Sequence, residues 1–269
     1  MYLEHYGFSA KPFGKTPNPA FFYNSPLHEE ALARLSHGAE EREFTLLTGE
    51  IGTGKTLLSR TLIDTLPDNY LPILIINPRL SPNQFLKTVA QQLGIESPSY
   101  FRVDLLNQIN GALYRCYEED RCPVIIIDEA QLIPSRSTFE EIRLLTNFQL
   151  DDINLLSIIL IGQPELRKRL RHGNFEAIRQ RIGIRYHLGP IGREDTGKYI
   201  AHRLQIADGD RDTISEEAVD MIFRYSGGLP RVINNIAANA LLTGFSKDLS
   251  QVGPDIVLDV VEDLDLELI

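Results

Sequence analysis

The 269-residue sequence has no tryptophan and only two cysteines, Cys116 and Cys122. The two cysteines form no C-x-x-C pair and have no histidines near them at ligand spacing, which disfavours a zinc site. A structural disulfide is disfavoured in the reducing cytosol, which is the compartment we expect. We therefore expect both to be buried or half-buried thiols.

Long hydrophobic runs are also missing. The longest apolar stretches, at 73–76, 124–127 and 155–161, are far shorter than the roughly 20 residues that a membrane-spanning helix needs. The N-terminus lacks the cationic start, the apolar block and the small-residue cleavage site of a secretory signal. These absences predict a cytoplasmic protein with no membrane span.

Positive charge is scarce as well. The chain has 27 Lys and Arg against 37 Asp and Glu, a net charge of -10 and a pI near 5.1. No overall electrostatic attraction therefore draws it to nucleic acid or to an anionic membrane, although a local basic patch would still do so. The hydrophobic share of 43% is that of an ordinary folded protein.

Short apolar runs alternate with helical patterns up to about residue 190. Such alternation predicts an α/β fold with a parallel sheet whose two faces are covered by helices. The predicted strands are 44–48, 73–77, 124–127, 156–161 and, more weakly, 184–188. Helical patterns occupy 28–41 and 56–66, and another helix begins at Ser81 and ends near Gly94.

The two ends of the chain differ from this middle part. Residues 1–26 are rich in aromatic residues and proline without a helical or strand period, which predicts a strap lying extended across a core. After Pro190 only helices are expected, at 195–207, 215–225, 229–245 and 255–264. The predicted organisation is a strap at 1–26, a P-loop core at 27–190 and a small helical lid at 191–269.

The strongest motif is a full match to G-x-x-x-x-G-K-[ST]. It lies directly after the first predicted strand and opens a helix, as a phosphate-binding loop requires. Glycines let the backbone N–H groups approach phosphates, Lys55 would reach the β- and γ-phosphates, and the Thr56 hydroxyl would bind Mg²⁺. The motif consists of Gly49, Glu50, Ile51, Gly52, Thr53, Gly54, Lys55 and Thr56.

A second motif is a buried strand, 124–127, that ends in Asp128 and Glu129. A carboxylate at the end of such a strand is typical of the Mg²⁺-binding acid of P-loop proteins, so we assign that role to Asp128 and water activation to Glu129. Two solvated acids at a strand end are the alternative. The strand 73–77 lies between the two motifs in sequence, which fits the subset of P-loop proteins that insert a strand between them.

Two polar residues further along are candidates for sensing the γ-phosphate. Gln163 follows the fourth predicted strand and could position the attacking water, or it could be a turn residue before a helix that begins at Pro164. Arg231 follows Gly227-Gly228-Leu229-Pro230 at the start of a lid helix. We interpret it as a sensor that couples the nucleotide to the lid.

Seven basic residues lie between positions 167 and 185, against one acid, Glu176. In so acidic a chain this clustering indicates an interface, and Arg179 or Arg181 could reach the nucleotide of a neighbouring subunit. Binding of DNA or RNA phosphates and a plain solvated face are the alternatives. The seven are Arg167, Lys168, Arg169, Arg171, Arg179, Arg181 and Arg185.

Together these residues resemble the AAA+ ATPases, and more narrowly the ExeA/GspA secretion ATPases, most closely their pilus-biogenesis relatives of the MshM type. The resemblance covers nearly the whole chain. Beyond the two phosphate-site motifs it is carried by Met1-Tyr2-Leu3-Glu4-His5, Gly7-Phe8, Pro12-Phe13-Gly14, Thr16-Pro17-Asn18, His28-Glu29-Glu30-Ala31-Leu32, Gln131, Gly162-Gln163-Pro164-Glu165-Leu166, Arg179-Gln180-Arg181 and Gly228-Leu229-Pro230-Arg231.

The resemblance implies an ATPase that uses ATP and Mg²⁺ and works as a homo-oligomer. It implies that Gln163 is sensor 1, that Arg231 is sensor 2, and that Arg179 or Arg181 is an arginine finger acting in trans. The strap would help to enclose the adenine. A secretion or pilus protein at the inner membrane would be the partner. Longer secretion-type members continue into a membrane helix and a peptidoglycan-binding domain, so wall remodelling would need those parts from a longer chain or from a partner.

Other functions remain open or are disfavoured. Related compact ATPases serve transposons as ATP-gated, DNA-binding adaptors, which is the main alternative. A GTPase is disfavoured because no [NT]-K-x-D segment follows the strand 124–127. The acidic C-terminal end could dock a basic partner or be a solvated helix face.

Overall fold

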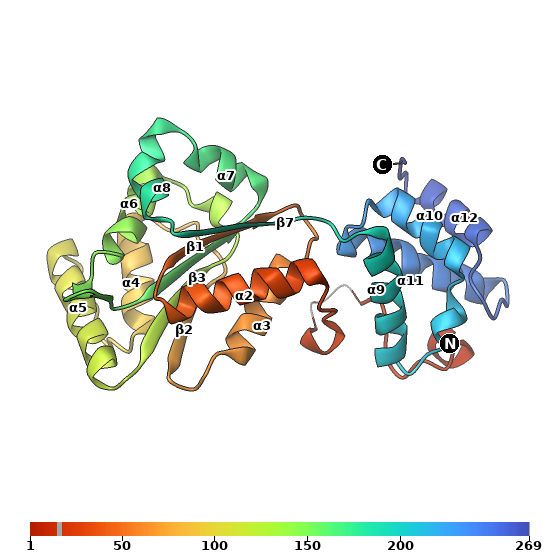
Figure 1. Cartoon of the computed structure of the whole chain (residues 1–269), viewed down its shortest axis with the longest axis horizontal. Coiled ribbons are helices and arrows are strands. Elements are labelled where there is room, and N and C mark those ends of the chain that lie inside the picture. The colour runs from red at the N-terminus through yellow and green to blue at the C-terminus, as the bar shows by residue number, and fades with distance from the viewer. Residues whose placement is uncertain (15–17, 269) are drawn as a thin grey trace. The chain divides into compact units, whose positions relative to one another are not determined.

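The computed structural model of the chain describes residues 1–14 and 18–268. Thr16 and Pro17, which carry part of the family resemblance, lie outside the described residues. The structure divides into two compact units (Figure 1). One is an α/β unit formed by Glu30–Gly49 and Leu58–Leu188, and the other is a helical unit formed by Met1–Glu29, Glu50–Leu57 and Gly189–Ile269.

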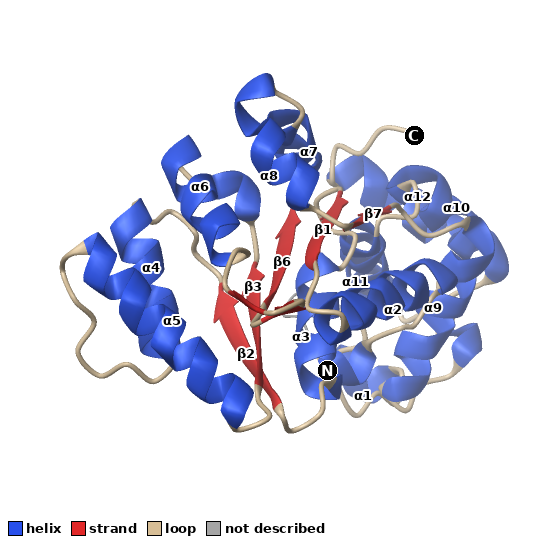
Figure 2. Ribbon diagram, turned by 60° about the vertical axis from the view of Figure 1, so that its left-hand side comes forward, coloured by secondary structure: helices blue, strands red, loops and turns tan. Residues whose placement is uncertain are grey.

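The α/β unit contains a five-stranded sheet that is parallel throughout, as predicted (Figure 2). Its order is β2-β3-β6-β1-β7. Because all the strands run the same way, their carboxyl ends share one edge of the sheet, where ligands bind in such folds. The strands are β1 (Phe44–Gly49), β2 (Tyr70–Ile75), β3 (Cys122–Ile127), β6 (Ser157–Gly162) and β7 (Ile184–Leu188).

An extra strand does lie between the strands of the two phosphate-site motifs, but it is β6. The expectation that the strand 73–77 fills that place is wrong, because β2 lies at the edge of the sheet beyond β3. Order along the chain does not fix order in a sheet. The edge position explains why β2 tolerates Pro72, which has no N–H to donate, and why the first half of β2 is only half-buried.

Helices cover both faces of the sheet (Figure 1). Five of them pack against one face in a single apolar cluster that includes Leu46, Ile125 and Ile158. They are α4 (Pro82–Gln92), α5 (Arg102–Glu118), α6 (Arg136–Leu145), α7 (Pro164–Leu170) and α8 (Glu176–Arg181). On the other face lie α2 (Pro26–Glu40) and α3 (Lys55–Thr65).

Smaller elements complete this unit. A short antiparallel hairpin of β4 (Gln149–Leu150) and β5 (Ile153–Asn154) was not predicted. Two 3₁₀ turns are η2 (Ala130–Leu132) and η3 (Gly173–Phe175). Both cysteines are buried free thiols, as expected, and burial raises the pKa of each.

The helical unit contains the four helices predicted after Pro190. They are α9 (Arg193–Ile206), α10 (Glu216–Ser226), α11 (Pro230–Ser246) and α12 (Pro254–Asp263), with a 3₁₀ turn η4 (Arg211–Thr213). Ser215 begins α10 because its hydroxyl accepts the N–H of Ala218 at 3.2 Å. Within the described residues, no helix is long and apolar enough to span a membrane.

The N-terminal segment packs on this helical unit. Its aromatic residues Phe8, Phe13 and Phe21 are buried in the core of the unit. The expectation of a segment without helix is wrong at α1 (Tyr2–His5) and at the 3₁₀ turn η1 (Pro19–Phe21). A buried arginine of α9, Arg203, anchors the segment: its Nε donates to the Pro12 carbonyl at 2.7 Å.

Candidate functional site

The loop that follows β1 contains two glycines with a backbone conformation that other residues rarely adopt. Gly52 has φ +89° and Gly54 has φ +98°, in the region that only glycine adopts readily. Space is restricted too, since a Cβ on Gly52 would lie 2.6 Å from the Cβ of Arg231 and one on Gly54 would lie 3.0 Å from Nε2 of His28. The glycines therefore serve both the loop conformation and the close approach of these two residues.

The side chains of Lys55 and Thr53 both donate a hydrogen bond to the same backbone carbonyl. The Glu50 carbonyl accepts from Lys55 Nζ at 2.7 Å and from the Thr53 hydroxyl at 2.9 Å. The Lys55 side chain is only 6% exposed. The α3 helix begins at Lys55, and the N-terminal end of a helix carries partial positive charge that suits an anion. The loop curls as a phosphate-binding loop does.

His28 holds the far side of the same loop. Its Nε2 lies 2.9 Å from the Thr53 carbonyl and its Nδ1 lies 2.7 Å from the Ser25 hydroxyl. Burial lowers the pKa of His28, which is 5% exposed, so the ring is neutral at pH 7. A carbonyl only accepts; hence Nε2 carries the proton and donates to Thr53, while Nδ1 accepts from Ser25. Sequence reasoning missed this role, for which the only signal was the position of His28 in the family motif.

The lid residue Arg231 lies against the loop. Its backbone N–H donates to the Gly52 carbonyl at 3.2 Å, and α11 begins one residue before it, at Pro230. The tight turn before α11 uses Gly227 and Gly228, both with positive φ. The structure thus brings Arg231 to the phosphate-binding loop, where a sensor of the nucleotide would have to lie; the sensing itself stays a prediction.

At the carboxyl ends of β3 and β6, the predicted pair Glu129 and Gln163 are in contact. Gln163 Nε2 donates to Glu129 Oε2 at 3.1 Å. Gln163 is also the residue that precedes α7, which agrees with the turn interpretation, while its positioning of the attacking water stays a prediction. Asp128 is 2% exposed, and its Oδ1 accepts the Glu129 N–H at 2.8 Å.

Gln131 completes this cluster and was not assigned a role from the sequence. Its Nε2 also donates to Glu129 Oε2, while its Oε1 accepts the N–H of Gln163 at 3.0 Å. A Cβ on Gly162 would come within 2.8 Å of that Oε1 atom, which explains the glycine. The signal was an amide side chain two residues after the catalytic candidate Glu129.

The backbone at Glu129 is left-handed, with φ 51° and ψ 38°. For a residue with a long side chain this conformation costs about 1 kcal/mol or more, and such strain is concentrated at functional sites. Here it turns the chain sharply after β3, so that Gln131 can reach back to the carboxylate.

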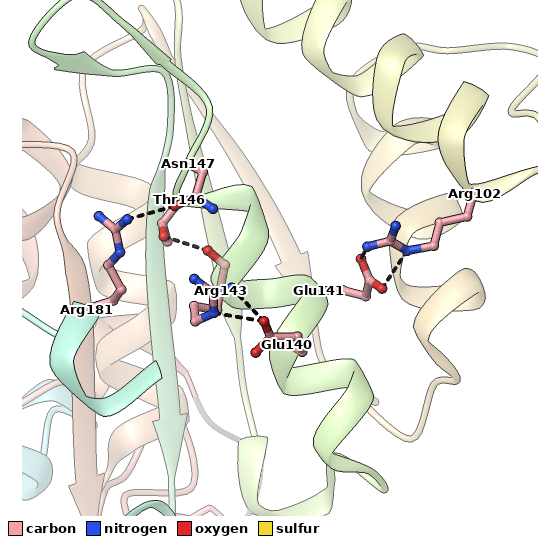
Figure 3. A network of polar contacts seen from close by, with 7 residues as sticks. All are labelled: Arg102, Glu140, Glu141, Arg143, Thr146, Asn147 and Arg181. Carbon is pink, nitrogen blue, oxygen red and sulfur yellow. Dashed lines mark hydrogen bonds and ion pairs between the residues drawn. The ribbon is translucent and has the colours of Figure 1, made fainter. Parts of the chain in front are cut away.

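The two candidate finger arginines have different surroundings. Arg181 donates to the Asn147 side chain at 2.8 Å (Figure 3). Arg179 instead lines a separate cavity, and its Nη1 donates to the Arg171 carbonyl at 3.2 Å. Neither arginine is hydrogen-bonded to Glu129 or Gln163 in the described part of the chain.

The candidate magnesium ligands have suitable chemistry. Mg²⁺ prefers hard oxygen donors and usually takes only one or two from the protein, with phosphate and water supplying the rest. The Thr56 hydroxyl and the Asp128 carboxylate are such donors. No group of three or more His, Cys, Asp or Glu side chains gathers as a metal site among residues 1–14 and 18–268.

Comparisons with known proteins agree with this geometry. The family model of the AAA domain matches residues 38–170, a range that contains the phosphate-binding loop, Asp128, Glu129 and Gln163. Cdc6p from Pyrobaculum aerophilum has 16% identity and a TM-score of 0.67, over 94% of this chain and 70% of that one. ORC2 from Aeropyrum pernix, solved as ADPNP-ADP complexes, has 16% identity and a TM-score of 0.64, over 92% and 72%. The fold is therefore that of the AAA+ P-loop ATPases, as predicted.

A curated relative is more similar in sequence. General secretion pathway protein A from Aeromonas hydrophila is 38% identical over 250 residues, which are 92% of this chain and 45% of that protein. The chain thus spans less than half the length of this relative. Residues 38–170 are thus similar to the AAA domain, and the chain is similar in sequence to general secretion pathway protein A. The predicted closeness to MshM stays a prediction.

Proposed function

We propose that the protein binds ATP with Mg²⁺ and hydrolyses it to ADP and phosphate. ATP hydrolysis drives assembly or remodelling in general (type II) secretion or in type IV pilus biogenesis. The observation that carries the proposal is the carboxylate of Glu129, which receives hydrogen bonds from both Gln131 and Gln163 on one oxygen. An acid oriented in this way by two amides suits a group that activates water.

ATP binding is assigned to the loop from Gly49 to Thr56. Its backbone N–H groups and the first turn of α3 surround the β- and γ-phosphates, and Lys55 neutralises part of their charge. Thr56 and Asp128 hold Mg²⁺, which when bound screens the phosphate charge. The ORC2 structure, which was solved with ADPNP and ADP, supports a nucleotide as the ligand of this fold.

Hydrolysis is assigned to Glu129. With Oε2 held by the two glutamines, Oε1 accepts a proton from the attacking water while the water oxygen bonds to the γ-phosphorus. The bond from that phosphorus to the β–γ bridging oxygen breaks, and ADP leaves with the bonding electrons. Gln163, as sensor 1, keeps the carboxylate and the water aligned.

Completion of the site is assigned to neighbouring subunits. Arg231 reads the γ-phosphate from the lid, and Arg179 is the finger supplied in trans in a homo-oligomer, where it stabilises the charge that spreads during transfer. A secretion or pilus protein of the inner membrane is the partner, and the ATPase works on its cytoplasmic side. The relationship to general secretion pathway protein A supports this setting.

Two experiments test the proposal. Isothermal titration calorimetry of the purified chain with ATP and Mg²⁺ should show saturable binding, and phosphate release should follow in a coupled assay. Absence of both heat and thermal stabilisation by ATP in a folded sample would overturn the proposal. For the cellular role, deletion of the gene should block export of a secreted enzyme or assembly of pili, and the Glu129→Gln variant should fail to restore either.

A further inference from the structure

A cavity of about 220 Å³ opens between α7, α8, β1 and β7 in the α/β unit. We call it the arginine hollow. Its floor is formed by the buried apolar side chains of Leu46, Leu170 and Ile182, and four guanidinium groups surround it. The four arginines are Arg167, Arg171, Arg179 and Arg185.

These four charges have no counter-charge in the described part of the chain. No Asp or Glu there forms an ion pair with any of them. The hydrogen bonds that Arg179 and Arg185 donate to other described residues go to backbone carbonyls. By contrast, Arg102 and Arg143 each form an ion pair with a carboxylate of α6 (Figure 3). Four like charges around one cavity repel each other, so an anion there would be stabilised.

The apolar floor narrows the class of anion. A nucleic-acid backbone needs an extended basic surface and gains nothing from a concave aliphatic floor. A polypeptide that carries an exposed leucine next to carboxylates matches both features, since the leucine would fill the floor while the nearby carboxylates reach the arginines. The chain itself contains a polypeptide segment of this kind near its C-terminal end.

The segment Glu262-Asp263-Leu264-Asp265-Leu266-Glu267-Leu268 has this pattern. Its four carboxylates are exposed, and none of them forms an ion pair within the described residues. Leu264 and Leu266 pack on the core of the helical unit, whereas Leu268 is 66% exposed. The backbone is already ordered, because the Leu266 N–H donates to the Val261 carbonyl at 3.0 Å.

The acids of this segment are also unfavourably placed for the isolated chain. Glu262 and Asp263 lie in the last turn of α12, which contains no basic residue. The carboxyl end of a helix carries partial negative charge, so carboxylates there are destabilising and a cation beside them is favoured. The hollow therefore offers positive charge and an apolar floor, and the segment offers negative charge and an exposed leucine.

We propose that the arginine hollow of one copy of the protein receives the segment 262–268 of a second copy. Leu268 lies against the floor, and Asp265 and Glu267 pair with Arg167 and Arg171 at the rim. Because the two surfaces are different, the contact is head-to-tail and builds a ring or an open chain. This contact requires no nucleotide, so it stands or falls separately from the proposed ATPase activity.

The test exchanges charges between the two surfaces in the 269-residue chain without nucleotide. Arg167→Glu/Arg171→Glu reverses the rim, and Asp265→Lys/Glu267→Lys reverses the segment; neither alters a residue assigned to ATP chemistry. Sedimentation velocity over a concentration series should show self-association of the wild type that weakens with salt. Each double variant alone should associate at least tenfold more weakly.

Mixing the two double variants should restore association, because each then offers a matched contact to the other. A chain with all four substitutions should also self-associate. The matched control is Arg115→Glu/Arg136→Glu, which changes charge equally on exposed parts of α5 and α6 and should leave association unchanged. Thermal melting of every variant confirms that it is folded.

Three results would overturn the proposal. One is a wild type that stays monomeric at all concentrations and salt levels used. Another is failure of the mixture and of the fourfold variant to associate. The third is binding of duplex DNA that is lost in Arg167→Glu/Arg171→Glu while the charge exchange restores nothing, which would assign the hollow to nucleic acid.

Discussion

His28 holds the carbonyl of Thr53 through Nε2 at 2.9 Å. In a trans peptide the C=O and the following N–H point in opposite directions, so fixing this carbonyl also fixes the N–H of Gly54. The N-terminal part of the chain, through Ser25 and His28, therefore determines how one amide of the phosphate-binding loop is presented.

The first prediction concerns this hydrogen bond between His28 and Thr53, which we call the His28 latch. His28→Asn removes the donor that reaches Thr53, whereas His28→Gln places an amide nitrogen at about the distance of Nε2. We expect ATP to bind on the order of tenfold more weakly to the Asn variant, as for loss of one buried hydrogen bond, and largely normally to the Gln variant. Calorimetry with ATP measures this, and equal affinities in the wild type and both variants would refute the latch.

The same residue predicts a pH dependence of stability. Burial lowers the pKa of His28 in the folded protein, so between the folded and unfolded pKa values the unfolded chain binds more protons. Its contribution to folding stability is therefore largest above about pH 6.5, the ordinary value, and falls as the pH drops below it. Urea unfolding of the wild type and His28→Gln from pH 7.5 to 5 should show the steeper loss in the wild type. Parallel curves would contradict this.

Gln131 should act on turnover and not on binding. Gln131→Ala leaves Glu129 held by Gln163 alone, so we expect kcat to fall by about 10- to 100-fold. KM and the ATP dissociation constant should stay within about twofold. Because both glutamines hold the same oxygen, Gln131→Ala/Gln163→Ala should lose less than the product of the two single effects. A rise in KM with unchanged kcat would instead assign Gln131 to substrate binding.

Substitution of Lys55 should abolish ATP binding, whereas substitution of Glu129 should abolish hydrolysis and leave binding intact. Lys55→Ala removes the charge that faces the phosphates, so calorimetry should detect no ATP binding. Glu129→Gln keeps the shape of the side chain but not the base, so ATP should still bind while phosphate release stops. Turnover at the wild-type rate by Glu129→Gln would remove the assignment.

The surroundings of the two arginines favour Arg179 as the finger. Arg181 is anchored by Asn147, so Arg181→Ala should chiefly lower stability. Arg179→Ala should abolish turnover yet leave ATP binding unchanged. Mixing Arg179→Ala with Glu129→Gln should restore part of the activity, because some interfaces then combine an intact arginine with an intact acid. No recovery in a confirmed mixed assembly would exclude action in trans.

Much of the fold could be predicted because its signals are local. The runs 124–127 of β3 and 158–161 of β6 are continuous and apolar, and the helices after Pro190 start at recognisable residues such as the cap Ser215 and Pro230. The position of β2 was misjudged because pairing in a parallel sheet depends on which strands meet across crossover helices. That information lies in packing, and Pro72 was its only trace in the sequence.

The candidate site shows the same division. The amino-acid sequence by itself determined which residues are candidates for the nucleotide site, the loop 49–56 with Asp128 and Glu129, since glycines, a lysine and paired acids at strand ends have few other uses together. Only the tertiary structure decided that Gln131 joins Gln163 on one carboxylate oxygen, that His28 and Arg231 lie against the loop glycines, and that four arginines surround one cavity. Those relationships join residues that are distant in the chain or set by a strained turn, and side chains meet there only after the strands and helices have packed.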